Sequence, residues 1–554
     1  MTFDPPAKRN LFLAAVVVLY VLSVAINLGF LEMAGEEPRR ALISIEMFHS
    51  GVLVRPTLLG WDYLNKPPFF NWVLTAFIWL TGSASEFVLR LPSLIAYLAM
   101  AYIHYRVARH FFSSTVALLS SFFILTCGDV YFYGLANGAE IDIFYSLLVY
   151  VQAISIFWFF HNKKILALYV FSYLFCALGF LTKAFPSILF QGLTLLGLCV
   201  YARSVSVLFR WQHLVGLAVF AGCTALYLSL YSQYHSPYLY LANLLNEALL
   251  KSAIGEKSYQ VVDKSILYPF LFLKMLLPWS LFLFLLVAKV NYRLWQNPMV
   301  RFSILFILFN IGVYWFTGQP KIRYVYMFLP FACTIFAAIY EQFTQAYPER
   351  LNKILKPFGF LFPVVMVVIL VLPFFASTQL AWVILLACAF FGLTYGYFFQ
   401  KANRIWMLLV GILLIRLTYA ALFIPIQYKG INNYKAQVNQ IITHAKGAKV
   451  VYTAEADAFP VRIQSRLFHY DFDTIAISPV MSYQVPYYYY LQTKMLMRFS
   501  AKKERVPVAF SYASQIKGET LDTLYHFFDW NMGQEAFIFR PKRQTNQVSA
   551  VKKL

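Results

Sequence analysis

The fold of this chain is decided close to its first residues, where positions 8–41 read KRNLFLAAVVVLYVLSVAINLGFLEMAGEEPRRA. Two basic residues precede an apolar run from about Leu11 to Leu31. This run is too long for the apolar region of a secretory signal, and no small-residue cleavage site follows it. Since a helix needs roughly 20 apolar residues to cross a bilayer, the run predicts a first transmembrane helix followed by a charged loop.

The composition of the whole chain is that of a polytopic membrane protein. Of its 554 residues, 60% are hydrophobic and only 13% are charged, whereas a soluble domain carries roughly 25% charged residues. A net charge of +22 would suggest nucleic acid if the protein were soluble. In a membrane protein it indicates basic cytoplasmic loops and anionic lipids instead, so we expect membrane lipids and no nucleic acid as partners.

Apolar runs predict about 13 membrane spans. They start near residues 11, 87, 113, 141, 165, 184, 212, 266, 302, 323, 357, 378 and 406. The piece from Pro67 to Gly82 is shorter and begins with two prolines, which predicts an interfacial or re-entrant helix. With a cytoplasmic N-terminus, every predicted inside loop is basic, as the positive-inside rule requires. The fold class is therefore expected to be an α-helical polytopic membrane protein.

The chain changes character near residue 429, where the long apolar runs stop. We expect a membrane domain over residues 1–428, with an outer loop and interfacial helices at about 32–86, and a second domain over 429–554. Residues 434–445 have helical spacing, and residues 449–453 and 536–540 have the composition of strands. This pattern predicts a small α/β domain outside the membrane.

The first outer loop concentrates charge at the edge of the membrane. Charge in this position is costly, so it indicates a functional site by default. Glu36 is a candidate general base, because a carboxylate can take a proton from a hydroxyl nucleophile, and Glu37 is a second acidic candidate. Arg39, Arg40 and Lys66 are candidate anion-binding cations. Together they predict chemistry on a negatively charged, lipid-bound substrate.

A purely structural interpretation of the same residues stays open. Glu36 and Glu37 would begin a helix, where the dipole favours acids, and Pro38 would occupy its first turn. Lys66, directly before Pro67, would anchor a helix end at the interface.

Further charged and polar side chains lie at predicted outer helix ends. They are Asp142, Lys183, Glu247, Lys251, Arg323 and Tyr324. Asp142 fits a substrate-orienting acid, a metal ligand, a partner for a cation or a helix cap. Glu247 and Lys251 also fit a salt bridge within one helix, whereas Arg323 and Tyr324 offer donors to an oxyanion. Their common side predicts a site for a phosphate or pyrophosphate. The chain has no Walker A motif, which argues against an ATP-driven pump.

The first loop resembles that of the GT-C glycosyltransferases. The residues that carry the resemblance are EEPRRA at 36–41, GWDYLNKPP at 60–68 and RLPS at 90–93. The sequence is most similar to the bacterial lipid A aminoarabinose transferases and the related protein mannosyltransferases, specifically over about residues 30–110 and more loosely beyond. The resemblance implies a multi-pass enzyme of the bacterial inner membrane that uses a polyprenyl-phosphate-linked sugar at the periplasmic face.

The resemblance also implies roles for individual residues. Glu36 takes the place of a catalytic aspartate, and Asp142 matches an acid at the start of the fourth span. Arg39 and Lys66 match binders of the donor phosphate, and Lys251 stands where an arginine contacts that phosphate. Glu36 and Asp142 are therefore the catalytic candidates, and we add Lys183, Arg323 and Tyr324 to the phosphate-binding group.

The expected reaction is transfer of a sugar from an undecaprenyl-phosphate donor to an envelope acceptor, which is a lipid A-like glycolipid, another glycan or a protein. Asn65 replaces an acid and Ala248 a histidine that are common in the family, so a divalent metal ion stays an open question. The main alternative function is a transporter or flippase of an anionic lipid or solute. A non-catalytic scaffold for envelope assembly is the third.

Overall fold

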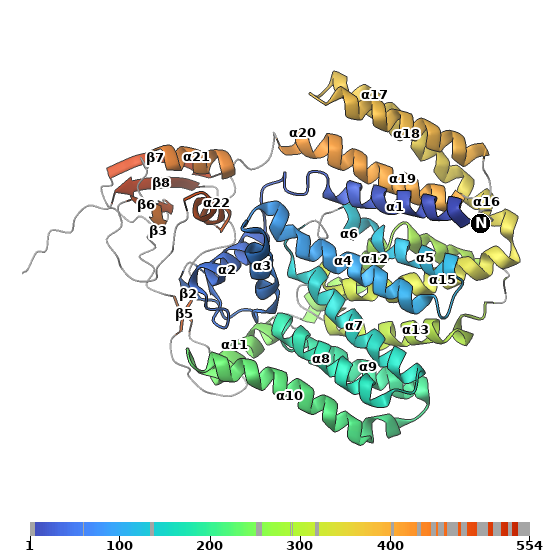
Figure 1. Cartoon of the computed structure of the whole chain (residues 1–554), viewed down its shortest axis with the longest axis horizontal. Helices are drawn as coiled ribbons and strands as arrows, with labels where there is room; N and C mark the ends of the chain where they lie inside the picture. The colour runs from blue at the N-terminus through green and yellow to red at the C-terminus, as the bar shows by residue number, and fades with distance from the viewer. Residues whose placement is uncertain are drawn as a thin grey trace, which may run out of the picture. The chain divides into compact units, whose positions relative to one another are not determined.

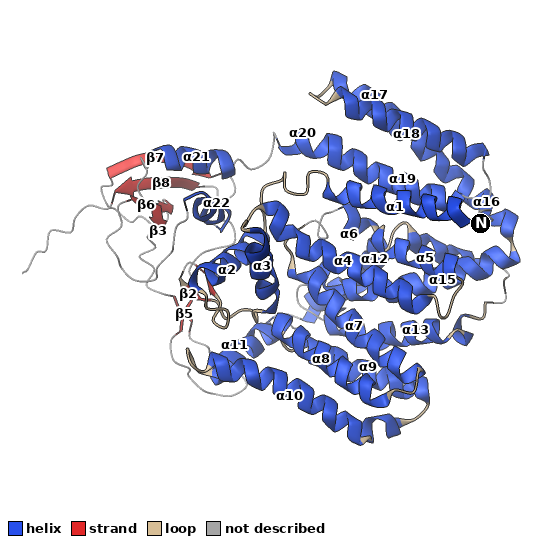
Figure 2. Ribbon diagram, viewed as in Figure 1, coloured by secondary structure: helices blue, strands red, loops and turns tan. Residues whose placement is uncertain are grey.

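The computed structural model describes residues 6–58, 60–132, 138–250, 258–288, 290, 292–315, 321–399, 404–428, 434–444, 450–452, 459–461, 475–477, 485–495, 508–512, 522–529 and 534–540. The chain divides into two compact units. The first comprises Met1–Leu31 and Leu64–Ile431, and the second comprises Glu32–Tyr63 and Asn432–Leu554. The described part of the first unit is built from helices, whereas the second combines helices with short strands (Figures 1 and 2).

Helices account for the described secondary structure of the first unit. The α-helices are α1 (Pro6–Ala25), α3 (Phe69–Thr81), α4 (Glu86–Ala108), α5 (Ser114–Leu125), α6 (Gly128–Phe132), α7 (Ile141–His161), α8 (Ile165–Lys183), α9 (Pro186–Ala202), α10 (Trp211–Tyr231), α11 (Pro237–Leu250), α12 (Ser258–Met275), α13 (Pro298–Asn310), α14 (Gly312–Trp315), α15 (Leu329–Ala346), α16 (Pro348–Leu355), α17 (Leu361–Val371), α18 (Leu380–Phe399), α19 (Arg404–Thr418) and α20 (Ile424–Tyr428). The 3₁₀ segments are η2 (Val205–Phe209), η4 (Trp279–Val287), η5 (Leu294–Gln296), η6 (Ile322–Phe328), η7 (Lys356–Phe360) and η8 (Leu372–Phe374), and η10 (Tyr419–Phe423) is a π-helix.

Nine helical segments of the described residues are long and apolar enough to cross a membrane, and a bent pair raises this number to 10. The predicted polytopic helical class is confirmed, whereas the predicted count of about 13 is not. The predicted spans near residues 11, 113 and 184 coincide with shorter apolar helices, and the one near 266 coincides with the bent pair, Ile266–Met275 and Trp279–Val287. Hydropathy detects the apolar run but not the place where the helix inside it ends.

The run after residue 113 shows why a helix ends early. Helix α5 stops at Leu125 although the sequence stays largely apolar. The amide of Gly128 donates to the carbonyl of Leu277, 2.7 Å away, instead of continuing the helix. A tertiary hydrogen bond thus satisfies a backbone group that a longer helix would have used, and the short helix α6 begins in a new direction.

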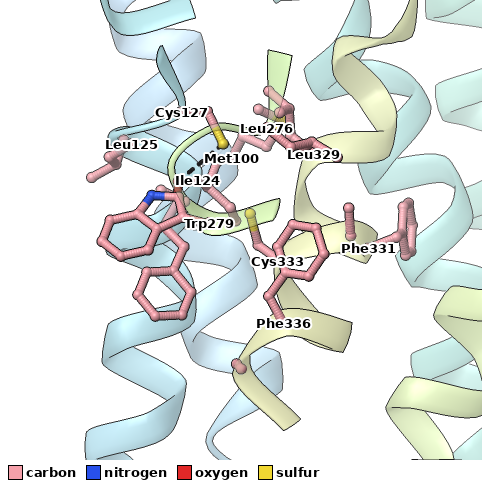
Figure 3. Close-up of a cluster of buried hydrophobic side chains, with 14 of the residues drawn as sticks. Met100, Ile124, Leu125, Cys127, Leu276, Trp279, Leu329, Phe331, Cys333 and Phe336 are labelled. Carbon is pink, nitrogen blue, oxygen red and sulfur yellow. Dashed lines mark hydrogen bonds between the residues drawn. The ribbon is translucent and has the colours of Figure 1, made fainter. Parts of the chain in front are cut away.

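Aromatic side chains fill the core between the helices. The rings of Phe123 and Trp279 stack with centroids 4.2 Å apart, and those of Phe306 and Phe331 stack at 4.0 Å. Figure 3 shows Trp279 and Phe331 with Cys333 in this buried cluster. Large rings bury much apolar area each, so these contacts hold η4 and α15 against their neighbours.

The second unit has two small sheets. One has the order β1 (Thr57–Leu58), β2 (Trp61–Asp62), β5 (Ile475–Ile477), β4 (Phe459–Val461), and the other β3 (Val450–Tyr452), β6 (Val508–Tyr512), β8 (Gln534–Arg540), β7 (Asp522–Asp529). Its helices are α2 (Glu37–Ser50), α21 (Tyr434–His444) and α22 (Val485–Met495), and α2 packs against α22. The predicted helix from 434 and the predicted strands at 449–453 and 536–540 are confirmed as α21, β3 and β8.

Candidate active site

Four charged side chains of the first unit meet where α7 begins and α8 ends. Lys183 Nζ donates to Asp142 Oδ1. Arg323 places its Nε 3.3 Å from Asp142 Oδ2 and its Nη1 3.3 Å from both carboxylate oxygens of Glu140. Two carboxylates therefore face two cations, and the formal charges of this group, which we call the ion cluster, cancel.

The local fold explains how these side chains come together. Helices α7 and α8 pack against each other and are joined by a short turn, so the first residue of α7 and the last of α8 lie at the same end. An acid in the first turn and a cation in the last turn are each favoured by the helix dipole. The capping alternative for Asp142 is not what the structure shows, because Glu140 is the N-cap residue and no side-chain cap bond is present there.

The ion cluster is almost completely shielded. The side chains of Asp142 and Lys183 are 3% and 5% exposed, whereas Arg323 is 19% exposed. Lys183 Nζ also lies 5.0 Å from the centre of the Tyr145 ring and 4.8 Å from that of Tyr324. Aromatic faces attract a cation, so Asp142 and the two rings hold Lys183 in place. Arg323 is the more accessible cation.

Lys66 is a fifth charged residue close to the ion cluster. It is half-buried and precedes α3, whose N-cap is Pro68. The charge of Lys66 acts on Asp142 together with those of Lys183 and Arg323. The structure thus brings together residues predicted from four separate stretches of sequence, and Lys66 adds one positive charge to a group that is otherwise neutral.

The acidic first loop belongs to the second unit. Glu36 is the N-cap residue of α2, and its carboxylate pairs with Arg39 Nη1 at 3.0 Å. Glu37 is buried and accepts a bond from the Ala34 amide. Arg40 is buried as well and donates to the Tyr63 hydroxyl at 3.0 Å. The predicted helix start is confirmed, and the Glu36 side chain stays 34% exposed.

Glu247 and Lys251 are the remaining predicted site residues. Glu247 lies half-buried on α11. Lys251 lies outside the described residues, so its predicted salt bridge with Glu247 and its predicted phosphate contact stay predictions.

Two acids of this region were not predicted as site residues from the sequence. Glu140 binds Arg323, 183 positions further along the chain. Asp129 accepts a hydrogen bond from the Tyr326 hydroxyl at 2.6 Å. The available signal was an acid at the edge of an apolar run, which is unusual in a membrane domain. Among the residues that the structure describes, no group of three or more His, Cys, Asp or Glu could hold a metal ion.

Comparison with known families gives a match within the first half of the chain. Residues 65–228 match a family described as dolichyl-phosphate-mannose-protein mannosyltransferase. This range contains Lys66, Asp129, Asp142 and Lys183. The chain is also 27% identical to an undecaprenyl phosphate-alpha-4-amino-4-deoxy-L-arabinose arabinosyl transferase of Photorhabdus laumondii, over 36% of either chain. A Proteus mirabilis enzyme of the same description is 30% identical over 34% of this chain and 35% of its own. The matches thus span roughly a third of these relatives.

Comparison with solved structures covers nearly the whole chain. The crystal structure of ArnT from Cupriavidus metallidurans bound to undecaprenyl phosphate superposes with a TM-score of 0.64 over 97% of this chain and 98% of that one, at 15% identity. The apo structure of the same protein gives 0.62. The predicted resemblance to this group of enzymes is confirmed, and the chain shares the fold of these two structures.

Proposed function

We propose that this protein is an integral-membrane glycosyltransferase that moves a sugar from an undecaprenyl-phosphate-linked donor to an envelope acceptor. The acceptor is a lipid A-like glycolipid, another glycan or a protein, and the reaction takes place at the periplasmic face of the bacterial inner membrane. The observation that carries the proposal is the ion cluster with Lys66 beside it, in a fold shared with a protein solved with undecaprenyl phosphate.

The chemistry needs positive charge near the leaving group. When an acceptor hydroxyl attacks the anomeric carbon, the bond to the lipid phosphate breaks and the phosphate carries the bonding electrons away. Preorganised cations stabilise such developing charge. Lys66 and Arg323 suit this role, because Lys66 is half-buried and Arg323 is the most exposed cation of the ion cluster.

Asp142 forms ion pairs with both Lys183 and Arg323. Both oxygens of Asp142 face cations, so its proposed contribution to catalysis is to hold Arg323 and Lys183 rather than to take a proton. Lys183 shares Asp142 with Arg323, and Arg323, as the more exposed of the two cations, is the one that we propose also contacts the phosphate. Tyr324 contributes its ring to this packing and, in our proposal, a hydroxyl donor to the phosphate.

Glu36 is the proposed base that deprotonates the acceptor, with Glu37 and Glu247 as further acidic candidates. Its carboxylate is partly exposed, as a base that must meet a substrate requires. Arg39 and Lys251 are proposed to complete the binding of the donor phosphate. We further propose that residues 1–428 form the catalytic membrane domain, including the outer loop at about 32–86, and that residues 429–554 form a periplasmic α/β domain.

A transfer assay tests the proposal. The full chain in lipid nanodiscs is mixed with undecaprenyl-phosphate-linked 4-amino-4-deoxy-L-arabinose and lipid A, and the products are identified by mass spectrometry. We expect a mass increase of the acceptor by one sugar and release of undecaprenyl phosphate. A transporter or flippase would leave the acceptor mass unchanged and would instead move the lipid between leaflets of proteoliposomes. A negative result with lipid A is repeated with total envelope glycans and proteins as acceptors.

A further inference from the structure

Asp129 is an acid of the first unit that the mechanism above does not use. It lies half-buried on the short helix α6, which follows α5. The Tyr326 hydroxyl donates to Asp129 Oδ2 at 2.6 Å. In the part of the chain that the structure describes, this is the only hydrogen bond to the carboxylate, and no cation pairs with it. A carboxylate offers about four acceptor sites, so most of its bonding capacity remains for another partner.

The segment η6 connects Asp129 to the ion cluster. A 3₁₀ helix has three residues per turn, so side chains three positions apart lie on the same face. Arg323 and Tyr326 have this spacing on η6. Arg323 binds Glu140 and Asp142, while Tyr326 binds Asp129. The charges of Asp142 and Arg323 also act on the Tyr326 hydroxyl. One face of η6 therefore holds Asp129 beside the proposed phosphate site.

The backbone around Asp129 is fixed by polar contacts that reach other helices. The Gly128 amide binds the Leu277 carbonyl at 2.7 Å, and a Cβ atom on Gly128 would lie 3.2 Å from that same oxygen. Arg416 Nε donates to the Tyr131 carbonyl at 2.9 Å, and the Tyr131 hydroxyl lies 2.5 Å from Ser23 Oγ. Helix α6 is thus held at both ends, which preorganises the carboxylate for binding.

Charge decides what this carboxylate can bind. Direct binding of a phosphate to Asp129 is unfavourable, because two anions repel each other. The cations of the ion cluster are already matched by Asp142 and Glu140. Groups that donate a hydrogen bond to a carboxylate, such as a hydroxyl or an ammonium, are what remains. A sugar attached to the donor phosphate carries such groups next to the phosphate itself.

We infer that Asp129, held in place by Tyr326, binds the sugar of the lipid-linked donor through a hydroxyl or ammonium group of that sugar. This inference rests on the proposed function and adds a sugar-recognising residue to it. Lys66 and Arg323 hold the phosphate, and Asp129 holds the group that is transferred. The enzyme then distinguishes donors by the position and charge of their hydrogen-bond donors.

Binding measurements with three probes test this inference. The full chain in nanodiscs is titrated with undecaprenyl phosphate, with undecaprenyl-phosphate-linked glucose and with undecaprenyl-phosphate-linked 4-amino-4-deoxy-L-arabinose. Loss of one charge-assisted hydrogen bond weakens binding by roughly tenfold or more. We expect Asp129→Asn to weaken at least one sugar-bearing probe by this factor and to leave undecaprenyl phosphate within about twofold of wild type. Asp129→Glu, which keeps the charge, should recover part of the affinity.

Two further variants control the experiment. Tyr326→Phe removes the support of the carboxylate and should weaken the same probe less than Asp129→Asn does. Glu349→Gln makes the same acid-to-amide change on exposed α16 and should change no affinity. If Asp129→Asn lowers the melting temperature strongly, the probe affinities of Asp129→Glu and Tyr326→Phe are compared with those of the wild type instead.

The outcomes separate the inference from the proposed function. Equal weakening of all three probes assigns Asp129 a structural role, and unchanged affinities show that it touches no ligand; either result overturns the inference. Equal binding of all three probes by the wild type also overturns the inference, because the sugar then adds no affinity. That result does not contradict the proposed binding of the lipid phosphate. A wild type that does not bind undecaprenyl phosphate at all refutes the proposed function and, with it, the inference.

Discussion

Removing the Asp142–Lys183 ion pair in two steps should reveal strong coupling between the two residues. Lys183→Met leaves Asp142 with Arg323 alone, and the formal charge of the ion cluster becomes −1. Asp142→Asn leaves Lys183 enclosed by two aromatic rings, and the charge becomes +1. Both side chains are at most 5% exposed, so each single change should lower the free energy of unfolding by about 3 kcal/mol.

The double variant restores a neutral cluster, because Glu140 and Arg323 remain paired at 3.3 Å. It should therefore lose only about 4 kcal/mol rather than the sum of the single losses, which gives a coupling energy of about 2 kcal/mol. Chemical unfolding of the full chain in mixed micelles, followed by the fluorescence of its 11 tryptophans, measures all four proteins. Lys353→Met makes the same change at an exposed position of α16 and should leave the free energy of unfolding unchanged.

Two results would refute this reasoning. Additive losses in the double variant would show that the two side chains do not stabilise each other. Losses below about 1 kcal/mol in both single variants would place the pair in a hydrated environment, where ion pairs contribute little.

Three further predictions follow from the same structure. Lys66→Ala should weaken the binding of undecaprenyl phosphate by roughly tenfold or more without lowering the melting temperature, since it removes a charge-assisted bond; an unchanged dissociation constant in the nanodisc titration contradicts this. Glu36→Gln should reduce the transfer rate by about 10² to 10⁴-fold in the folded protein, and retained turnover removes Glu36 as the base. Gly216→Ala should lower the melting temperature by several degrees, because the new Cβ would lie 2.4 Å from Tyr173 Cδ2 where α10 packs on α8. Gly222→Ala on the same helix, which has nothing within 4 Å, is the matched control and should not lower it.

The membrane helices were predictable because their signal is local. An apolar run is excluded from water whatever its neighbours are, so every predicted start has a helix at or close to it. Helix lengths were less predictable. Helix α5 ends at Leu125, and the Gly128 amide bonds to the Leu277 carbonyl instead of continuing the helix. The apolar run itself contains no signal that identifies Leu277 as this partner.

The charged residues of the candidate site were recognisable in the sequence, but their geometry was not. Asp142, Lys183 and Arg323 were recognisable as charges at helix ends, where lipid makes charge costly. Their pairing was not recognisable: Lys183 is buried against Asp142, and its predicted contact with a phosphate stays a prediction. Asp129 was overlooked, because its hydrogen bond comes from Tyr326 on a segment almost 200 positions away.

The sequence by itself therefore determined that the chain folds as membrane helices, followed by a small α/β part, and which helix ends carry charge. These properties depend on short stretches of chain, whose transfer from water to lipid is nearly independent of the rest. Only the tertiary structure decided which charges neutralise one another and which stay available to a ligand. Ion pairing depends on distances of a few ångströms between residues far apart in sequence, and the packing of α7, α8 and η6 sets those distances.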